Sequence, residues 1–117
     1  MSYEIVRTWG LLESQFDSRC IEVVRAAAHE ALTLSSVPKP EDMMMDMKSG
    51  AGHDSAWTSR VIPTGMIFVP SRNGISHNPS EYTSPEDCAL GAQVLLGAVL
   101  RYDALMANND PSSENQL

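Results

Sequence analysis

The chain has 117 residues, of which 43% are hydrophobic, and 8 Lys and Arg against 15 Asp and Glu give it a net charge of −7. This is enough material for one domain with a modest core. The acidic balance argues against nucleic acid and against an anionic membrane surface as partners, because both attract basic side chains. Only Cys20 and Cys88 occur, so there is no disulfide framework and no cysteine zinc site. With no secretory signal pattern at Met1, we expect a cytoplasmic protein with reduced thiols.

The first predicted elements are a strand and a helix. Residues 3–12 are rich in β-forming side chains and are predicted to form the strand. The helix is predicted to start at Ser14, with Asp17 as the acid of a short capping box and an apolar stripe that runs to Ala31. His29 lies off this stripe and is expected on the surface. Two prolines predict a loop over residues 35–40.

Two apolar segments follow in the middle of the chain. Residues 43–47 read Met-Met-Met-Asp-Met. Such a cluster could be a soft-metal or adaptable binding patch, but a short buried strand is the favoured interpretation, because methionine usually packs. Residues 66–69 form a continuous apolar run between Gly65 and Pro70. This pattern predicts a strand that is buried on both faces.

The last third of the chain contains the clearest helix start. A short helix is predicted from Asp54 or Ser55, and a turn is predicted at residues 71–74. Ser84 is a cap residue followed by Pro85 and two acids, which is typical of a helix N-terminus. The buried side of this long helix is predicted to contain Cys88, Ala92, Leu95, Val99, Tyr102 and Met106.

The most apolar stretch of the chain lies inside this helix, at residues 90–100. It is too short to cross a bilayer and is interrupted by Gly91 and Gly97, so a buried helix is expected, and no membrane partner. Each glycine costs helix propensity but permits the close approach of a neighbouring segment.

Two short segments set small residues directly before a histidine: 49–54 (Ser-Gly-Ala-Gly-His-Asp) and 74–78 (Gly-Ile-Ser-His-Asn). Glycine lets the backbone approach a ligand closely, and imidazole offers a metal-ligand nitrogen or a proton. Either segment alone is weak, since a lone histidine in a turn is more often solvated. Residues 62–70 between them and Glu81 after them extend the pattern.

This joint pattern, from about Tyr3 to Leu105, resembles the C-terminal catalytic segment of the metal-dependent N-carbamoyl amidohydrolases. That group contains β-ureidopropionase, N-carbamoyl-L-amino-acid hydrolase and allantoate amidohydrolase. The resemblance implies an α/β fold, the C-terminal portion of a zinc-exopeptidase-like catalytic domain with a mixed sheet flanked by helices. Residues 1–13 would be the last strand of a lid or dimerisation domain, residues 14–108 the catalytic part, and residues 109–117 a disordered tail. The family's N-terminal lobe has no counterpart here.

The resemblance also assigns site residues. His77 would bind one of two bridged divalent metals (zinc, or manganese or cobalt), and Glu81 would support that site without touching the metal. Gly52 and His53 would form a substrate-binding loop. The plainer alternatives are that Glu81 is an ordinary acid ahead of a helix and that the loop is a tight turn needing glycine's positive φ. No residue of the chain is assigned a catalytic role.

The implied function is hydrolysis of a non-peptide carbon–nitrogen bond in an N-carbamoyl amino acid, such as N-carbamoyl-β-alanine, by a water that two metals activate. The complete enzyme would be a homodimer. The general base and the other metal ligands would lie in the missing lobe, so this chain alone should bind metal weakly or not at all and should be inactive. The alternative is a catalytically inactive, truncated remnant or a protein that binds a partner.

Overall fold

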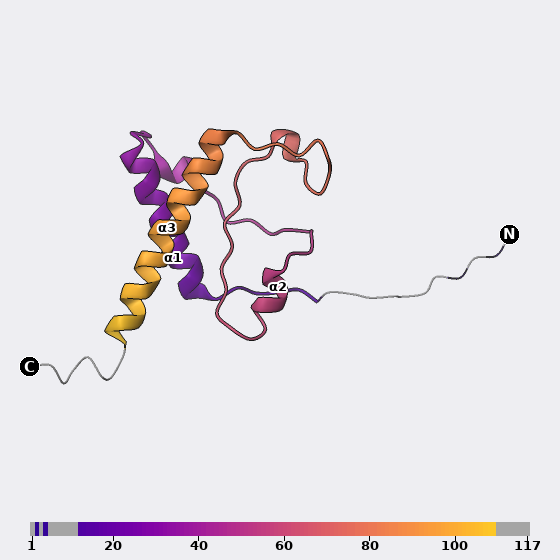
Figure 1. The fold of residues 1–117 in the computed structure, drawn as a ribbon, viewed down its shortest axis with the longest axis horizontal. Helices are drawn as coiled ribbons and strands as arrows, with labels where there is room; N and C mark the ends of the chain where they lie inside the picture. The colour runs from indigo at the N-terminus through magenta and orange to yellow at the C-terminus, as the bar shows by residue number, and fades with distance from the viewer. Residues whose placement is uncertain (1, 3, 5–11, 110–117) are drawn as a thin grey trace, which may run out of the picture.

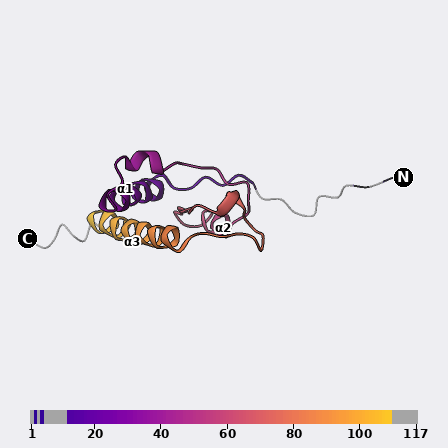
Figure 2. The same ribbon diagram turned by 90° about the horizontal axis from the view of Figure 1, so that it is seen from above.

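The computed structural model of the protein describes residues 2, 4 and 12–109. Its main elements are the helices α1 (Ser18–Leu34) and α3 (Pro85–Asn108), which lie side by side in both views of Figures 1 and 2. The segment between them forms loops that extend to one side of the pair (Figure 1). It carries three short elements: η1 (Pro40–Met43), α2 (Ser55–Thr58) and η2 (Arg72–Gly74).

Helix α1 begins later than the sequence predicts. Asp17, predicted as the third residue after a cap at Ser14, is itself the N-cap, and its Oδ1 accepts hydrogen bonds from the backbone N–H of Arg19 (2.9 Å) and Cys20 (3.1 Å). The Asp17 N–H donates to the carbonyl of Thr64 (3.1 Å), which ties this residue to another segment. A charged acceptor at the positive end of the helix therefore sets the start, and Ser14 lies outside.

The Asp17 cap makes the stability of α1 dependent on pH. The hydrogen bond from the Cys20 N–H, together with the contacts to Arg19, holds the pKa of Asp17 below its usual value of 3.8. A carboxyl with a depressed pKa stabilises the fold above its unfolded pKa, and this contribution is lost as the pH falls through the lower folded value. We expect wild type to lose more thermal stability than Asp17→Asn over that acidic window in circular dichroism melts, because Asn caps without titrating. An identical pH profile for the two proteins would contradict this role.

Helix α3 confirms the predicted start, because the Ser84 hydroxyl accepts from the backbone N–H of Asp87 (3.1 Å). The core lies between α3 and α1 and consists of small side chains: Ala27, Ala31, Val94 and Ala98. Gly97 explains the close approach of the helices.

A Cβ placed on Gly97 would lie 3.1 Å from the Cβ of Ala27. The predicted role of Gly97 in close approach is therefore confirmed. Gly91 has the same role toward the segment that joins α1 to α3, since a Cβ there would lie 2.5 Å from Cγ1 of Val69. Arg101 pairs with Glu30 across the two helices.

The predicted buried side of α3 is wrong. The buried residues are Val94 and Ala98, whereas Leu95 and Val99 are each 56% exposed and Cys88 is exposed. The helix is apolar on several sides, so periodicity could not select the face, and the small residues that admit α1 selected it instead. Of the described helices, α3 alone is long and apolar enough to cross a membrane, with 11% of its most apolar stretch buried; core helices of soluble proteins pass the same test.

The predicted mixed sheet is not formed among residues 12–109, which contain helices, turns and loops. Residues 66–69 were predicted to be buried on both faces, yet Phe68 and Val69 are 39% and 37% exposed. The strand predicted for residues 43–47 is also absent: Met43 is the last residue of η1, and residues 44–47 form no regular element. A strand exists only when its backbone pairs with a neighbour, and no described segment pairs with either one.

Two further predictions concern the chain ends. The strand over residues 3–12 and the tail over residues 109–117 lie almost wholly outside the described residues.

The predicted short helix is confirmed as α2, and the predicted turn at residues 71–74 is confirmed as η2. His29 is exposed on α1, as expected.

Candidate functional site

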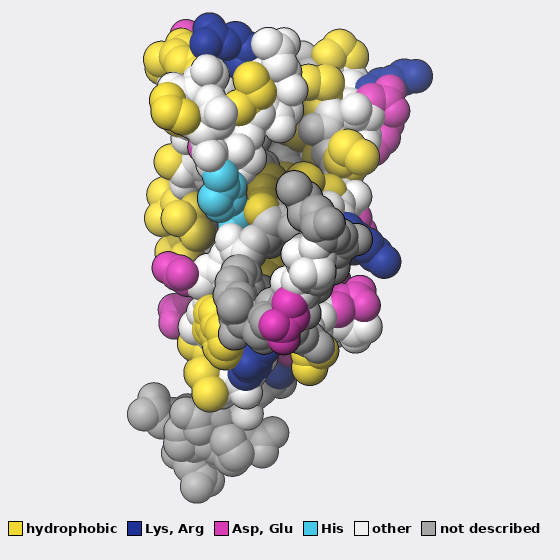
Figure 3. Space-filling view, turned by 90° about the vertical axis from the view of Figure 1, so that its right-hand side faces the viewer, with side chains coloured by type: hydrophobic (Ala, Val, Ile, Leu, Met, Phe, Trp, Pro, Cys, Tyr) yellow, Lys and Arg dark blue, Asp and Glu magenta, His cyan; other side chains and the backbone are white. Residues whose placement is uncertain are grey.

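The two histidines of the glycine-containing segments lie together. The ring centroids of His53 and His77 are 6.1 Å apart, although 23 residues lie between them in the chain. Both line one small pocket of about 330 Å³, together with Phe68, Glu81, Thr83 and neighbouring residues of the central loop. Figure 3 shows histidine side chains on the surface beside a hollow that contains hydrophobic side chains. The structure therefore brings together three of the four predicted site residues, with Gly52 adjacent in sequence.

His77 sits in an unusual backbone conformation. Its φ is 57°, in the left-handed region that side chains other than glycine seldom adopt. Its backbone N–H donates to Oε2 of Glu81 (3.2 Å), and its Nδ1 lies 2.7 Å from the hydroxyl of Ser76. Strained backbone held by local hydrogen bonds is typical of functional sites. Because Nδ1 is engaged, Nε2 remains as the ring nitrogen for a ligand.

Glu81 thus supports His77 through the backbone rather than through the ring. A carboxylate that accepts from the N–H of a left-handed residue stabilises that conformation and so fixes the direction of the imidazole. This contact fits the predicted supporting role of Glu81. The plainer interpretation, that Glu81 is an ordinary acid ahead of a helix, does not require a hydrogen bond to His77.

His53 is half-buried and held from two sides. Its Nε2 lies 2.9 Å from the hydroxyl of Ser49, and its ring meets that of Phe68 edge-on at 5.5 Å between centroids. Gly52 beside it has no positive φ, and a Cβ placed there would meet nothing within 4 Å. The conformation therefore does not require glycine, so the tight-turn interpretation of this position is wrong. The open space at Gly52 leaves room for the close approach of a ligand, which is the role that the resemblance predicts.

Sequence reasoning missed the side chains that orient the two rings. Ser76 immediately precedes His77, and Ser49 lies four residues before His53. A serine one to four residues before the histidine in each segment was the available signal. Asp54, one of the two predicted starts of the short helix, is the N-cap of α2, but its side chain makes no capping hydrogen bond. Its carbonyl accepts from the backbone N–H of Trp57 (2.9 Å) and of Thr58 (3.1 Å).

The donors at this site do not by themselves complete a metal centre. No group of three or more His, Cys, Asp or Glu residues within the described part of the chain is arranged to hold a metal ion. A catalytic zinc ordinarily has three protein ligands and one water. The pocket can supply one or two imidazole nitrogens, so a metal here would need further ligands.

Comparison with a family model identifies the family of the chain. The model of Peptidase family M20/M25/M40 matches residues 2–101, a span that includes both histidine segments. The chain belongs to this family. Its members are generally metal-dependent, and the family fits a zinc-exopeptidase-like fold, although the described residues form no sheet.

Several similar proteins carry the names of amidohydrolases. The chain is 42% identical over 80 residues to N-carbamoyl-L-amino acid amidohydrolase of Geobacillus stearothermophilus, and these residues make up 68% of this chain. It is 46% identical over 85 residues, 73% of the chain, to N-carbamoyl-L-amino-acid amidohydrolase of Rhizobium meliloti. It is 36% identical over 86 residues, 62% of the chain, to allantoate amidohydrolase of Bacillus subtilis.

The matched segments cover 18%, 18% and 21% of these three relatives, so the chain spans about a fifth of their length. No solved structure matches the chain significantly. The family match and the matches to these three relatives confirm the resemblance to the C-terminal segment of the N-carbamoyl amidohydrolases.

Proposed function

We propose that this chain supplies part of the active site of a metal-dependent amidohydrolase that cleaves the carbon–nitrogen bond of N-carbamoyl amino acids, N-carbamoyl-β-alanine among them. The observation that carries the proposal is the pairing of His53 and His77 in one pocket, 6.1 Å apart. The names of the relatives support the class of bond, since they act on N-carbamoyl-L-amino acids and on allantoate.

In this proposal, His77 holds a divalent ion through Nε2 while Nδ1–H donates to the Ser76 hydroxyl, 2.7 Å away. Metal-binding histidines usually donate their second ring N–H in this way, which fixes the tautomer. When bound, a divalent metal lowers the pKa of water and so provides a nucleophile near neutral pH. Glu81 keeps the His77 backbone in place through its hydrogen bond to the N–H.

The substrate side of the site is the loop that carries Gly52 and His53. The open space at Gly52 lets the carboxylate end of a substrate approach the backbone, and the half-buried His53 ring can donate a hydrogen bond to it. The remaining metal ligands and the general base would come from residues outside this chain. We further propose that the complete enzyme is a cytoplasmic homodimer. The competing proposal is a remnant that no longer hydrolyses anything.

The test compares the chain alone with a chimera in which it replaces the matched 85 residues of the Rhizobium meliloti relative. With zinc, manganese or cobalt added, we expect the isolated chain to release no ammonia from N-carbamoyl-β-alanine or N-carbamoyl-L-amino acids, because too few metal ligands are present. We expect the chimera to release ammonia. Turnover by the isolated chain would show that the site assembles in another way, and a folded, metal-loaded chimera without turnover would favour the remnant.

A further inference from the structure

The methionines of residues 43–47 are accessible to solvent, whereas the favoured sequence interpretation places them in a buried strand. Met43, Met45 and Met47 are 68%, 85% and 53% exposed. They line a groove of about 1110 Å³, which α1, the first half of α3 and residues 66–70 also border. Since these side chains are not used for packing, the other interpretation of the cluster, a patch of soft metal ligands, has to be weighed against the geometry.

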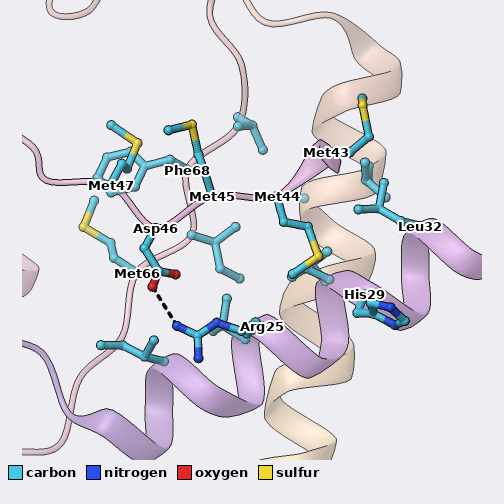
Figure 4. A pocket seen from close by; sticks show the side chains of 18 of the residues that line it. Arg25, His29, Leu32, Met43, Met44, Met45, Asp46, Met47, Met66 and Phe68 are labelled. Carbon is cyan, nitrogen blue, oxygen red and sulfur yellow. Dashed lines mark hydrogen bonds and ion pairs between the residues drawn. The ribbon is translucent and has the colours of Figure 1, made fainter. Parts of the chain in front are cut away.

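An ion pair orients two of these methionines. Asp46 pairs with Arg25 of α1 (2.7 Å), as the dashed line in Figure 4 shows. The chain leaves η1 in an extended conformation, with φ −126° and ψ 143° at Met44. Successive side chains of an extended chain point to opposite sides. Because Asp46 points to α1, Met45 and Met47 both point away from it, and Figure 4 shows them together on that side.

Met66 brings a third thioether from a distant segment. It lines the same groove, and Figure 4 shows it on the side of Met45 and Met47, with Met43 away from them. The Met66 sulfur accepts a hydrogen bond from the Ser55 hydroxyl (2.9 Å), which holds this side chain in place. A thioether sulfur has two lone pairs, so one of them remains for a metal ion. Three sulfurs from two segments therefore face one side of the groove.

Thioether ligands select the metal. Magnesium and calcium ions take oxygen ligands, and zinc takes thiolate, imidazole or carboxylate groups. Thioether sulfur is a soft ligand that suits Cu(I). The charged and titratable groups of the lining are mainly acidic: Glu22, Glu41, Asp46 and Asp87, against Arg25 and His29. The only guanidinium among them is already paired, and the whole chain carries −7, so the surroundings attract a cation.

We propose that Met45, Met47 and Met66 form a binding site for Cu(I), with their three thioether sulfurs as ligands. The ion of the proposed hydrolase is divalent and is held by a nitrogen of His77, whereas this ion is monovalent and is held by sulfur. The two proposals share no ligand, and either can fail while the other stands.

The test is a titration of the 117-residue chain with Cu(I), kept reduced by ascorbate under argon, in competition with a coloured Cu(I) chelator. Every protein in the series carries Cys20→Ser and Cys88→Ser, because thiolates also bind Cu(I). We expect one Cu(I) per chain and only sulfur neighbours of copper in X-ray absorption, which methionine alone can then supply. Nitrogen neighbours would place the ion at the histidines and would overturn the proposal, as would displacement of Cu(I) by excess zinc.

Met45→Leu, Met47→Leu and Met66→Leu test the three ligands, and Met43→Leu is the matched control. Leucine conserves the volume of methionine and removes the sulfur, so the folds, checked by circular dichroism, should not change. Each of the three variants should weaken Cu(I) binding by about tenfold or more, since it removes a ligand of the ion. Met43→Leu, at an exposed methionine of the same cluster, should bind as the parent does. Equal affinities in all four variants would refute the site, and so would weakening that only Met43→Leu produces.

Discussion

In the chimera with the Rhizobium meliloti relative, His77→Ala is expected to lower bound metal and kcat together, by about 100-fold or more in kcat. The imidazole is proposed as a metal ligand, and its loss removes the ion on which water activation depends. Gly52→Val should behave differently, because a Cβ at this position meets nothing within 4 Å of the protein itself. The added side chain would obstruct only the substrate, so KM should rise while metal content stays near that of wild type.

Mass spectrometry of bound metal, beside steady-state kinetics for each variant, separates these outcomes. His77 has a φ of 57°, and Ala tolerates this conformation poorly, so His77→Asn is the needed second variant. Asn keeps the left-handed backbone while removing the imidazole, and it should also lose metal. His29→Ala, at an exposed histidine on α1, controls for the loss of any imidazole. If His77→Asn retains its metal, the ligand assignment is wrong; if Gly52→Val loses metal as readily, the loop supports the metal site instead of the substrate.

The features that could be predicted from sequence are those that neighbouring residues decide. Ser84 caps α3 through a bond three residues along the chain, and the turn at residues 71–74 depends on its own asparagine and glycine. Asp17 was recognised as part of a helix start but placed wrongly within it. Its bond to the Arg19 and Cys20 amides is local, whereas its anchor to Thr64 comes from a distant segment.

The features that could not be predicted depend on distant partners. Residues 66–69 have the composition of a buried strand, but burial and pairing require a neighbour that residues 12–109 do not provide. The packed face of α3 was missed because Gly97 and Ala98, rather than the larger Leu95 and Val99, admit α1.

Spacing could not predict the candidate site, because the 23 residues between His53 and His77 allow many distances between the two rings. The resemblance to a family placed both histidines at one site, and the structure places their rings 6.1 Å apart. The serines that hydrogen-bond to the two rings belong to the same short segments as the histidines. Local sequence therefore encodes the contacts around each histidine, and the fold brings the two together.

The contact between α1 and α3 is where a single substitution should destabilise the chain most. A Cβ on Gly97 would lie 3.1 Å from the Cβ of Ala27 and 3.3 Å from Nη1 of Arg101. Gly97→Leu should therefore separate the helices and disturb the ion pair between Arg101 and Glu30. Overpacking of this kind typically costs about 1–3 kcal/mol, and we expect a loss in the upper part of this range in urea unfolding. The gain in helix propensity, about 1 kcal/mol, would offset only part of it.

Ala92→Leu is the matched control, because it adds the same side chain to an exposed position of α3, where surface substitutions change the free energy of unfolding by about 0.5 kcal/mol or less. A compensating pair tests the contact directly. Gly97→Ala should destabilise the protein when Ala27 is present, and Ala27→Gly should relieve that effect because it removes the Cβ that Gly97→Ala meets. A coupling free energy near zero between positions 27 and 97 would mean that the two helices do not pack at this point. Equal unfolding free energies for Gly97→Leu and Ala92→Leu would place the core of the chain elsewhere.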